Sequence, residues 1–282
     1  MGIYAVTGAA SGMGQAAAER LRAKGHRVIA VDLRDAEVIA DLATPKGRCD
    51  AGAAVLALAD GHLNGAILAA GVGPVPGSDK AALIMSVNYF GVVGLLQAWQ
   101  PALAATGNAK VVVVSSNSTT TTPLVPRSVV RNLLHGDLDV AVRKVRRYGL
   151  ATSAFAYAAS KIAVSQWVRH HAVGTNWAGA GIRVNAIAPG AIKTPLLDQQ
   201  LATPREAKAI QSFPVPLRAF GDPAHLAEWM VFMLSDAADF LCGSVIFVDG
   251  GSDAYFRPRD WPRSVPIRRL PDYAMRMLRW PR

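Results

Sequence analysis

The strongest indication of the fold is the stretch IYAVTGAASGMG, residues 3–14. A short apolar run ends in a glycine-rich turn, and this turn opens a helix-like segment. Gly8, Gly12 and Gly14 fall where a backbone has to turn tightly and approach a pyrophosphate, while the first N–H groups of the following helix supply donors and a favourable dipole. The order of strand, glycine turn and helix favours a phosphate-binding unit over a purely structural turn.

Similar apolar runs recur along the chain with little alternation, which is typical of parallel strands buried on both faces. Segments with apolar residues at helical spacing separate them, for example at 13–24, 84–104 and 157–176. This pattern predicts an α/β fold, a Rossmann-type doubly wound parallel sheet, in a single domain over residues 1–255. The predicted strands span 3–8, 27–33, 65–71, 110–116, 182–190 and 244–251, with a very short additional strand near 37–40.

The composition is that of a globular protein, because the chain has 282 residues and 51% of them are hydrophobic. No run approaches about 18 consecutive apolar residues, and the N-terminus runs directly into strand-like sequence, so we expect no membrane-spanning helix and no cleavable leader. Cys49 and Cys242 have neither metal-ligand nor redox spacing. We therefore expect a cytoplasmic protein with reduced thiols and no metal.

The net charge of +10 is concentrated in two segments. Residues 257–282 hold eight arginines and two aspartates, and residues 117–156 hold six basic and two acidic side chains, which gives +6 and +4. No nucleic-acid motif accompanies this charge, so we expect no specific nucleic-acid partner. The basic extension 256–282 interleaves arginine with Trp261 and Trp280, and it is predicted to be disordered, to pack on a partner subunit or to contact an anionic membrane.

Asp32 ends the second predicted strand, 18 residues after Gly14. A carboxylate there accepts hydrogen bonds from the ribose diol of an adenosine and repels a 2′-phosphate, which favours NAD over NADP. Arg34 is the complication, because a nearby arginine accommodates that phosphate. The ends of the third and fourth strands are placed to flank the adenine and to pass close to the cofactor. The predicted nucleotide contacts are Gly8, Ser11, Gly12, Met13, Gly14, Asp32, Leu33, Asp41, Leu42, Ala70 and Gly71.

The pentapeptide YAASK places Tyr157 and Lys161 four residues apart, on one face of a helix that we expect to begin there. A tyrosine is a poor base at neutral pH, and a neighbouring ammonium lowers the phenol pKa by favouring the phenolate. The preceding strand ends in VVVVSSNS, whose serines offer a hydroxyl partner. We expect Ser116 to fill this role from its position at the strand end, with Ser115 and Ser118 as the alternatives.

In this order the motifs resemble the short-chain dehydrogenase/reductase family. The resemblance covers residues 3 to about 251 and implies an NAD(H)-dependent enzyme that interconverts a secondary alcohol and a ketone. It rests on TGAASGMG (7–14), AAG (69–71), SVNYFG (86–91), VVVVSSNS (111–118), YAASK (157–161) and VNAIAPG with the following IKTP (184–195).

The resemblance also implies a role for each matching residue. Tyr157 is the general base in oxidation and the acid in reduction, and Lys161 holds the nicotinamide ribose and lowers the tyrosine pKa. Ser116 orients the substrate oxygen, and Asn88 anchors a water that relays protons from Lys161 to solvent. The nicotinamide contacts are Pro189, Gly190, Ile192 and Thr194.

The segments SVNYFG (86–91) and IAPGAIKTPLL (187–197) and two further features resemble the bacterial 3α-hydroxysteroid dehydrogenase/carbonyl reductase branch of that family. The segment RDAEVIADL leaves no room for a crossover helix after the second strand, and Ser116 and Tyr157 are 41 residues apart. This branch implies a steroid 3α-hydroxyl as the substrate. The alternatives are another bulky apolar alcohol or aromatic ketone, and a non-catalytic nucleotide-binding scaffold. Substrate choice is expected to lie in the loop 195–215.

The enlarged gap holds an insertion at about 120–150 that reads as a helical hairpin. Its apolar residues fall on one face of each helix, and HGD at 135–137 marks the break between them. An apolar stripe needs to be covered. In the resembled enzymes a comparable insertion supports dimer formation, so we expect a homodimer or homotetramer, with a lid over the substrate cleft as the alternative. The stripe residues are Val129, Val130, Leu133, Leu134, Leu138, Val142 and Val145.

Overall fold

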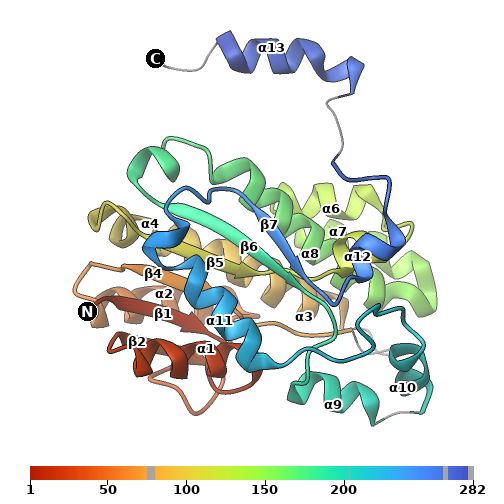
Figure 1. Ribbon diagram of the computed structural model, residues 1–282, viewed down its shortest axis with the longest axis horizontal. Coiled ribbons are helices and arrows are strands. Elements are labelled where there is room, and N and C mark those ends of the chain that lie inside the picture. Colours follow the sequence, from red (N-terminus) through yellow and green to blue (C-terminus); the bar gives the residue numbers. More distant parts are fainter. Residues whose placement is uncertain (75–79, 203, 263–265, 279–282) are drawn as a thin grey trace.

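Seven parallel strands form one sheet in the order β3-β2-β1-β4-β5-β6-β7 (Figure 1). The structure is a computed structural model that describes residues 1–74, 80–202, 204–262 and 266–278. All seven predicted strands are present, so the doubly wound parallel sheet is confirmed. The strands are β1 Ile3–Thr7, β2 Arg27–Asp32, β3 Val38–Ile39, β4 Gly65–Leu68, β5 Lys110–Val114, β6 Arg183–Pro189 and β7 Val245–Val248.

The helices differ from the predicted segments mainly at their ends. The segment expected at 157–176 is α8 Thr152–His171, so Tyr157 lies in its second turn and not at its start. The small residues before Tyr157 continue the helix, and Gly174 follows its end. The other helices, with η for short 3₁₀ or π turns, are α1 Gly12–Ala23, α2 Pro45–Leu58, α3 Ala81–Met85, η1 Ser86–Gly91, α4 Val92–Ala105, α5 Ser118–Thr121, α6 Arg127–Leu134, α7 Leu138–Val145, η2 Arg146–Ala151, η3 Ala178–Ala180, α9 Pro195–Leu201, α10 Pro204–Gln211, α11 Pro223–Met233, η4 Asp236–Ala238, α12 Ser252–Phe256, η5 Ile267–Arg269 and α13 Leu270–Leu278.

The order of the strands creates a switch point between β1 and β4. From β1 the chain proceeds outward through β2 and β3, and it then returns to pair β4 with the other edge of β1. Residues 33–37 join β2 to β3 without a helix, as the sequence predicts. Open α/β sheets bind ligands outside the carboxyl ends of the strands at such a switch point.

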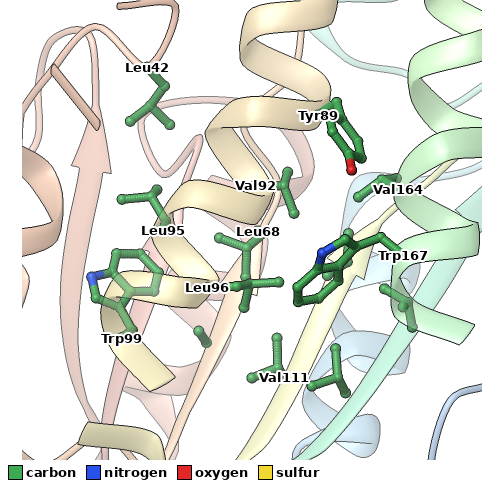
Figure 2. Close-up of a cluster of buried hydrophobic side chains, with 14 of the residues drawn as sticks. Leu42, Leu68, Tyr89, Val92, Leu95, Leu96, Trp99, Val111, Val164 and Trp167 are labelled. Atoms are coloured by element: carbon green, nitrogen blue, oxygen red, sulfur yellow. The ribbon is translucent and has the colours of Figure 1, made fainter. Parts of the chain in front are cut away.

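Alternate residues of each strand face two hydrophobic layers. Leu68 and Val111 belong to the layer beneath α2, α4 and α8, whereas Val112 belongs to the layer beneath α1 and α11. Figure 2 shows the first layer, in which Leu96 of α4 lies beside Leu68 and Val111, with Trp167 of α8 across from it. Each fully buried side chain of this size contributes about 1.5–3 kcal/mol, so the layers fix the sheet against its helices.

The helices α3, η1 and α4 form one continuous helical stretch, Ala81–Ala105. Its length and its mean hydropathy of 1.6 would suit a membrane span, but 56% of its apolar window is buried inside the protein, as expected of a core helix. The π-helical turn at Ser86–Gly91 widens this stretch around Asn88. Such turns occur frequently at functional sites.

The predicted hairpin of the insertion is present as α6 and α7. However, six of its seven apolar stripe residues belong to the chain's own core, where α6 packs on α8 and α7 packs on α3. Leu134 is exposed, at 37%, and Leu138 is half-buried against the core. The inference that a second subunit has to cover this stripe is therefore wrong, because the chain's own helices cover it.

Candidate active site

A cavity of about 270 Å³ opens at the carboxyl ends of β1, β2 and β4, at the switch point of the sheet. Twelve of the predicted cofactor residues line it, whereas Tyr157, Lys161, Pro189, Gly190 and Ile192 are not among its walls. The twelve are Gly8, Ser11, Gly12, Met13, Gly14, Asp32, Leu33, Asp41, Leu42, Ala70, Gly71 and Thr194.

Two glycines of the turn after β1 have no room for a side chain. Gly8 has φ of +70°, and a Cβ atom there would lie 2.7 Å from the backbone nitrogen of Ala70. A Cβ atom on Gly14 would overlap the backbone oxygen of Gly8. The backbone of this turn therefore packs directly on β4 and on the first turn of α1, and it leaves backbone N–H groups at the cavity wall.

Asp32 lies at the end of β2 with both carboxylate oxygens engaged by backbone. Oδ2 accepts a hydrogen bond from Ala10 N at 2.9 Å, and Oδ1 accepts one from Leu33 N at 2.7 Å. The side chain is thus fixed at the cavity wall and keeps lone pairs for a diol. Arg34 points away, because its side chain is 84% exposed and its nitrogen is 3.9 Å from Asp35.

The segment after β6 also supplies walls of the cavity, of which sequence reasoning identified Thr194 but not its neighbours. Thr194 caps α9 and lies against Gly12, so the segment after β6 closes over the glycine turn. Leu196 of α9 lies against Gly73, which follows β4. These contacts join segments far apart in the sequence, and small or apolar residues give no motif to find them by. The additional wall residues are Ala40, Ala69, Val72, Leu83, Val87, Pro195 and Leu196.

The predicted catalytic hydroxyls meet between β5 and α8. The Ser116 side chain is hydrogen-bonded to that of Tyr157. Ser115 points elsewhere, since its hydroxyl lies 2.7 Å from the hydroxyl of Ser165. Ser118 donates its backbone N–H to Ser116 Oγ at 3.1 Å. Of the three serines, Ser116 is therefore the one whose hydroxyl reaches the tyrosine.

Lys161 is almost completely buried, at 4% exposure. Its ammonium donates to the carbonyl oxygen of Val114, the last residue of β5, at 2.7 Å. Its nitrogen also lies 5.9 Å from the centre of the Tyr157 ring. Burial lowers the pKa of Lys161 to about 8, because the charged form loses its hydration.

Burial raises the pKa of Tyr157, and its hydrogen bond with Ser116 opposes this rise. The expectation that this pKa lies below its usual value is thus wrong for this arrangement, because desolvation of the phenolate is the largest cause and raises the pKa. Ser116 is the neighbour that lowers the tyrosine pKa here.

Asn88 lies at the π-helical turn and is fully buried. Its amide clamps the backbone after β4, accepting from Val72 N at 2.8 Å and donating to Val72 O at 2.9 Å. It also donates to Ser160 Oγ at 3.4 Å, and Ser160 donates to Tyr157 O at 2.7 Å. Asn88 and Ser160 therefore tie the loop after β4 to α8, a link that the sequence did not reveal. The proton relay through Asn88 remains a prediction.

A Cβ atom on Gly71 would lie 3.3 Å from Asn88 Oδ1 and 3.8 Å from Lys161 Nζ. Gly71 also lines the cavity, so these buried groups stand directly behind its wall. Pro189 and Gly190 lie at the end of β6, where Pro189 O accepts from Asn117 N at 2.9 Å. The catalytic residues and the predicted nicotinamide contacts thus belong to the same carboxyl edge of the sheet.

The arrangement suits proton transfer beside a bound dinucleotide. It combines a hydroxyl pair, a buried cation of lowered pKa and a cavity with glycine walls and a fixed carboxylate. Among the described residues, no group of three or more His, Cys, Asp or Glu side chains could hold a metal ion.

Comparison with known proteins gives consistent matches. A profile of the family described as enoyl-(acyl carrier protein) reductase matches residues 139–253. The 3-alpha-hydroxysteroid dehydrogenase/carbonyl reductase of Comamonas testosteroni is 38% identical over 258 residues, which are 92% of this chain and 99% of that protein. The short-chain dehydrogenase/reductase bsc3 of Alternaria brassicicola is 31% identical over 197 residues, 69% of this chain and 70% of that protein.

A solved structure agrees with these matches. The crystal structure of the 3-alpha-hydroxysteroid dehydrogenase from Pseudomonas sp. B-0831 complexed with NADH has a TM-score of 0.84 to this chain. The two sequences are 40% identical, and the match covers 92% of this chain and all of that one.

Proposed function

The chain belongs to the short-chain dehydrogenase/reductase family and is an oxidoreductase. We propose that it oxidises the 3α-hydroxyl of steroids with NAD and reduces the corresponding ketones with NADH. The main support for this proposal is the 38% sequence identity to a 3-alpha-hydroxysteroid dehydrogenase/carbonyl reductase over 92% of the chain. The intact set of Ser116, Tyr157, Lys161 and Asn88 supports catalysis, because a non-catalytic scaffold has no need of all four.

In this proposal the protein orients the substrate and manages one proton. The nicotinamide, when bound, supplies or accepts the hydride. Ser116 holds the substrate oxygen, and Tyr157 removes its proton in oxidation or returns it in reduction. Lys161 holds the ribose and passes the proton from Tyr157 to a water that Asn88 anchors, and the Asn88 amide also stabilises the loop after β4.

The glycine turn and Asp32 support NAD as the cofactor. The cradle of Gly8 and Gly14 would be filled by any added Cβ atom, which suits a pyrophosphate against bare backbone. The fixed carboxylate of Asp32 suits the ribose diol and opposes a 2′-phosphate, while Arg34 points into solvent.

Asp32→Asn is expected to raise the ratio of kcat/KM with NADP to that with NAD by about tenfold or more, because it removes the charge that repels the phosphate. Steady-state kinetics with both cofactors measures the ratio. Asp35→Asn, a matched change at a side chain that is 84% exposed, should leave it unchanged. If Asp32→Asn left the ratio of kcat/KM with NADP to that with NAD unchanged, another group would have to discriminate between the two cofactors.

The substrate is tested by NADH formation with a panel of 3α-, 3β- and 17β-hydroxysteroids and simple secondary alcohols. We expect turnover of the 3α-hydroxysteroids at kcat/KM at least about tenfold above the small alcohols, as for a substrate that fills an apolar site. Turnover of small alcohols or aromatic ketones alone would replace the steroid proposal with the broader alcohol–ketone activity of the family.

We also propose that the protein forms a homo-oligomer through α11 and the edge strand β7. Trp229 and Phe232 on α11 are 43% and 48% exposed, and Phe240, before β7, is fully exposed. Strand β7 is the last of the sheet, and no strand among the described residues pairs with its outer edge. Exposed aromatic side chains beside an open edge favour pairing with a second copy.

The double variant Trp229→Glu/Phe232→Glu is expected to halve the mass in solution, because two charges at the centre of an apolar contact oppose burial. Light scattering during size-exclusion chromatography measures the mass. Leu150→Glu, at a side chain that is 77% exposed on η2, serves as the control. If both variants keep the mass of the parent protein, the contact lies elsewhere.

A further inference from the structure

The C-terminal helix α13 is amphipathic, with an arginine-rich face and a broad apolar face. At 100° per residue, Leu270, Tyr273, Ala274, Met277 and Leu278 fall on one side. The opposite side holds one acidic residue, Asp272, and three arginines, two of them from the turn that leads into the helix: Arg268, Arg269 and Arg276.

Nothing in the described part of the chain covers the apolar face. Leu270, Tyr273, Met277 and Leu278 are 49%, 53%, 67% and 85% exposed. Figure 1 shows α13 standing apart from the helices and the sheet, joined to them only by the chain that follows α12. The helix therefore presents an apolar surface that needs an external partner.

The surface of the protein that faces α13 has the same sign of charge. A cavity of about 1250 Å³ between α6, α8 and α13 is lined by Arg127, Arg131 and Arg169 on one side and by Arg268, Arg269 and Arg276 on the other. Asp272 is the acidic residue among its walls. Repulsion across this gap opposes packing of α13 on its own protein and favours an anionic partner.

We propose that α13 is a membrane anchor that lies in the surface of an anionic phospholipid bilayer. The apolar face enters the boundary between headgroups and acyl chains, and the arginines contact phosphate groups, as in other interfacial basic amphipathic helices. The whole segment 257–282 adds a formal charge of +6 to this attraction.

The apolar face distinguishes a membrane from the other anionic partners. A nucleic acid would engage the arginines and leave Leu270, Met277 and Leu278 exposed to water. A second copy of the chain would bring two segments of charge +6 together. A bilayer with anionic lipid covers the apolar side chains and neutralises the arginines at the same time.

The full-length protein is tested by cosedimentation with vesicles of phosphatidylcholine that contain about a quarter phosphatidylglycerol, and with vesicles of phosphatidylcholine alone. We expect binding to the anionic vesicles that weakens with salt. Arg268→Ala/Arg276→Ala should lower the partition coefficient by about 25-fold, from about fivefold for each arginine. Leu270→Ser/Met277→Ser should lower it by about tenfold.

The matched control is Arg22→Ala/Lys24→Ala, which removes the same charge at the exposed end of α1. It should bind vesicles like the parent protein, and all variants should keep the oxidoreductase activity in solution. An equal loss in the control, or equal binding to both vesicles, would overturn the proposal. The proposal would also be overturned if Leu270→Ser/Met277→Ser changed the mass in solution but left vesicle binding unchanged. The apolar face would then pack on a second copy of the chain. Binding of duplex DNA that survives this variant, without vesicle binding, would assign the helix to nucleic acid.

Discussion

Tyr157→Phe is expected to lower kcat for alcohol oxidation by about 10³-fold, because general acid–base catalysis contributes about 10²- to 10⁴-fold. The variant removes one oxygen from a ring that is packed against the core, so the fold and the hydrogen bonds of Asn88 and Lys161 should persist. NADH formation at saturating cofactor measures kcat, and fluorescence titration with NADH measures binding. We expect the NADH affinity to change little, since no wall of the cavity is altered.

Tyr148→Phe provides the matched control. Tyr148 is 46% exposed on η2, where its ring packs edge-on against Phe155, and phenylalanine keeps that contact. The control should retain the activity of the parent protein. If Tyr157→Phe kept a tenth or more of the activity, another group would have to handle the proton and the role assigned to Tyr157 would be wrong.

Lys161→Met is expected to lower kcat/KM for oxidation by about 10²-fold near neutral pH. Without Lys161 the proposed proton relay is interrupted, and the phenol of Tyr157, whose pKa burial already raises, has to lose its proton directly to solvent. The variant should therefore recover part of its activity as the pH rises. In the parent protein, oxidation should increase with pH up to about 8, where Lys161 loses its proton. Rates from pH 6 to about 10 test both statements.

The same substitution should have the opposite effect on stability. The pKa of Lys161 is lowered from 10.5 to about 8, so the buried charge destabilises the native state below pH 8 by about 3 kcal/mol. Lys161→Met also loses the hydrogen bond from Lys161 Nζ to Val114 O, which reduces the gain in stability by about 1 kcal/mol. We therefore expect the free energy of unfolding of Lys161→Met to be about 2 kcal/mol higher than that of the parent protein at pH 7.

This difference should shrink as the pH rises from 8 towards 10.5, because the native parent protein then loses the proton before the unfolded chain does. Urea unfolding at several pH values measures it. Lys24→Met, at an exposed side chain at the end of α1, is the control and should change neither kinetics nor the slope with pH. A variant that lost stability and activity together would point to a structural role for Lys161.

The sequence predicted the parts of the site that local chemistry determines. Glycines with no space for a side chain, an acidic residue at a strand end and the pair Tyr157 and Lys161 each follow from a short motif, and the structure brings them to one edge of the sheet. The seven strands followed from apolar runs that need burial on both faces.

What the sequence did not reveal depends on contacts between distant segments. Leu196 closes the cavity because α9 folds back over the loop after β4, and Ser160 matters only because Asn88 reaches it. The tyrosine pKa was mispredicted because the burial of the phenol depends on the whole core. The stripe of α6 and α7 was assigned to a partner subunit because amphipathicity does not say which surface covers it.

The hairpin α6–α7 also bears on how the active site comes into existence. It lies within the 40 residues between Ser116 and Tyr157, and its apolar side chains fill the same core as α8. Closing a loop of this length lowers the conformational entropy of the chain, and the packing of the hairpin has to offset this loss. Local opening of α6 and α7 would therefore release the catalytic hydroxyls from each other, which makes the hairpin and the site one cooperative folding unit. Amide hydrogen exchange in α6 and α7 should then follow the loss of activity on mild denaturation, ahead of global unfolding.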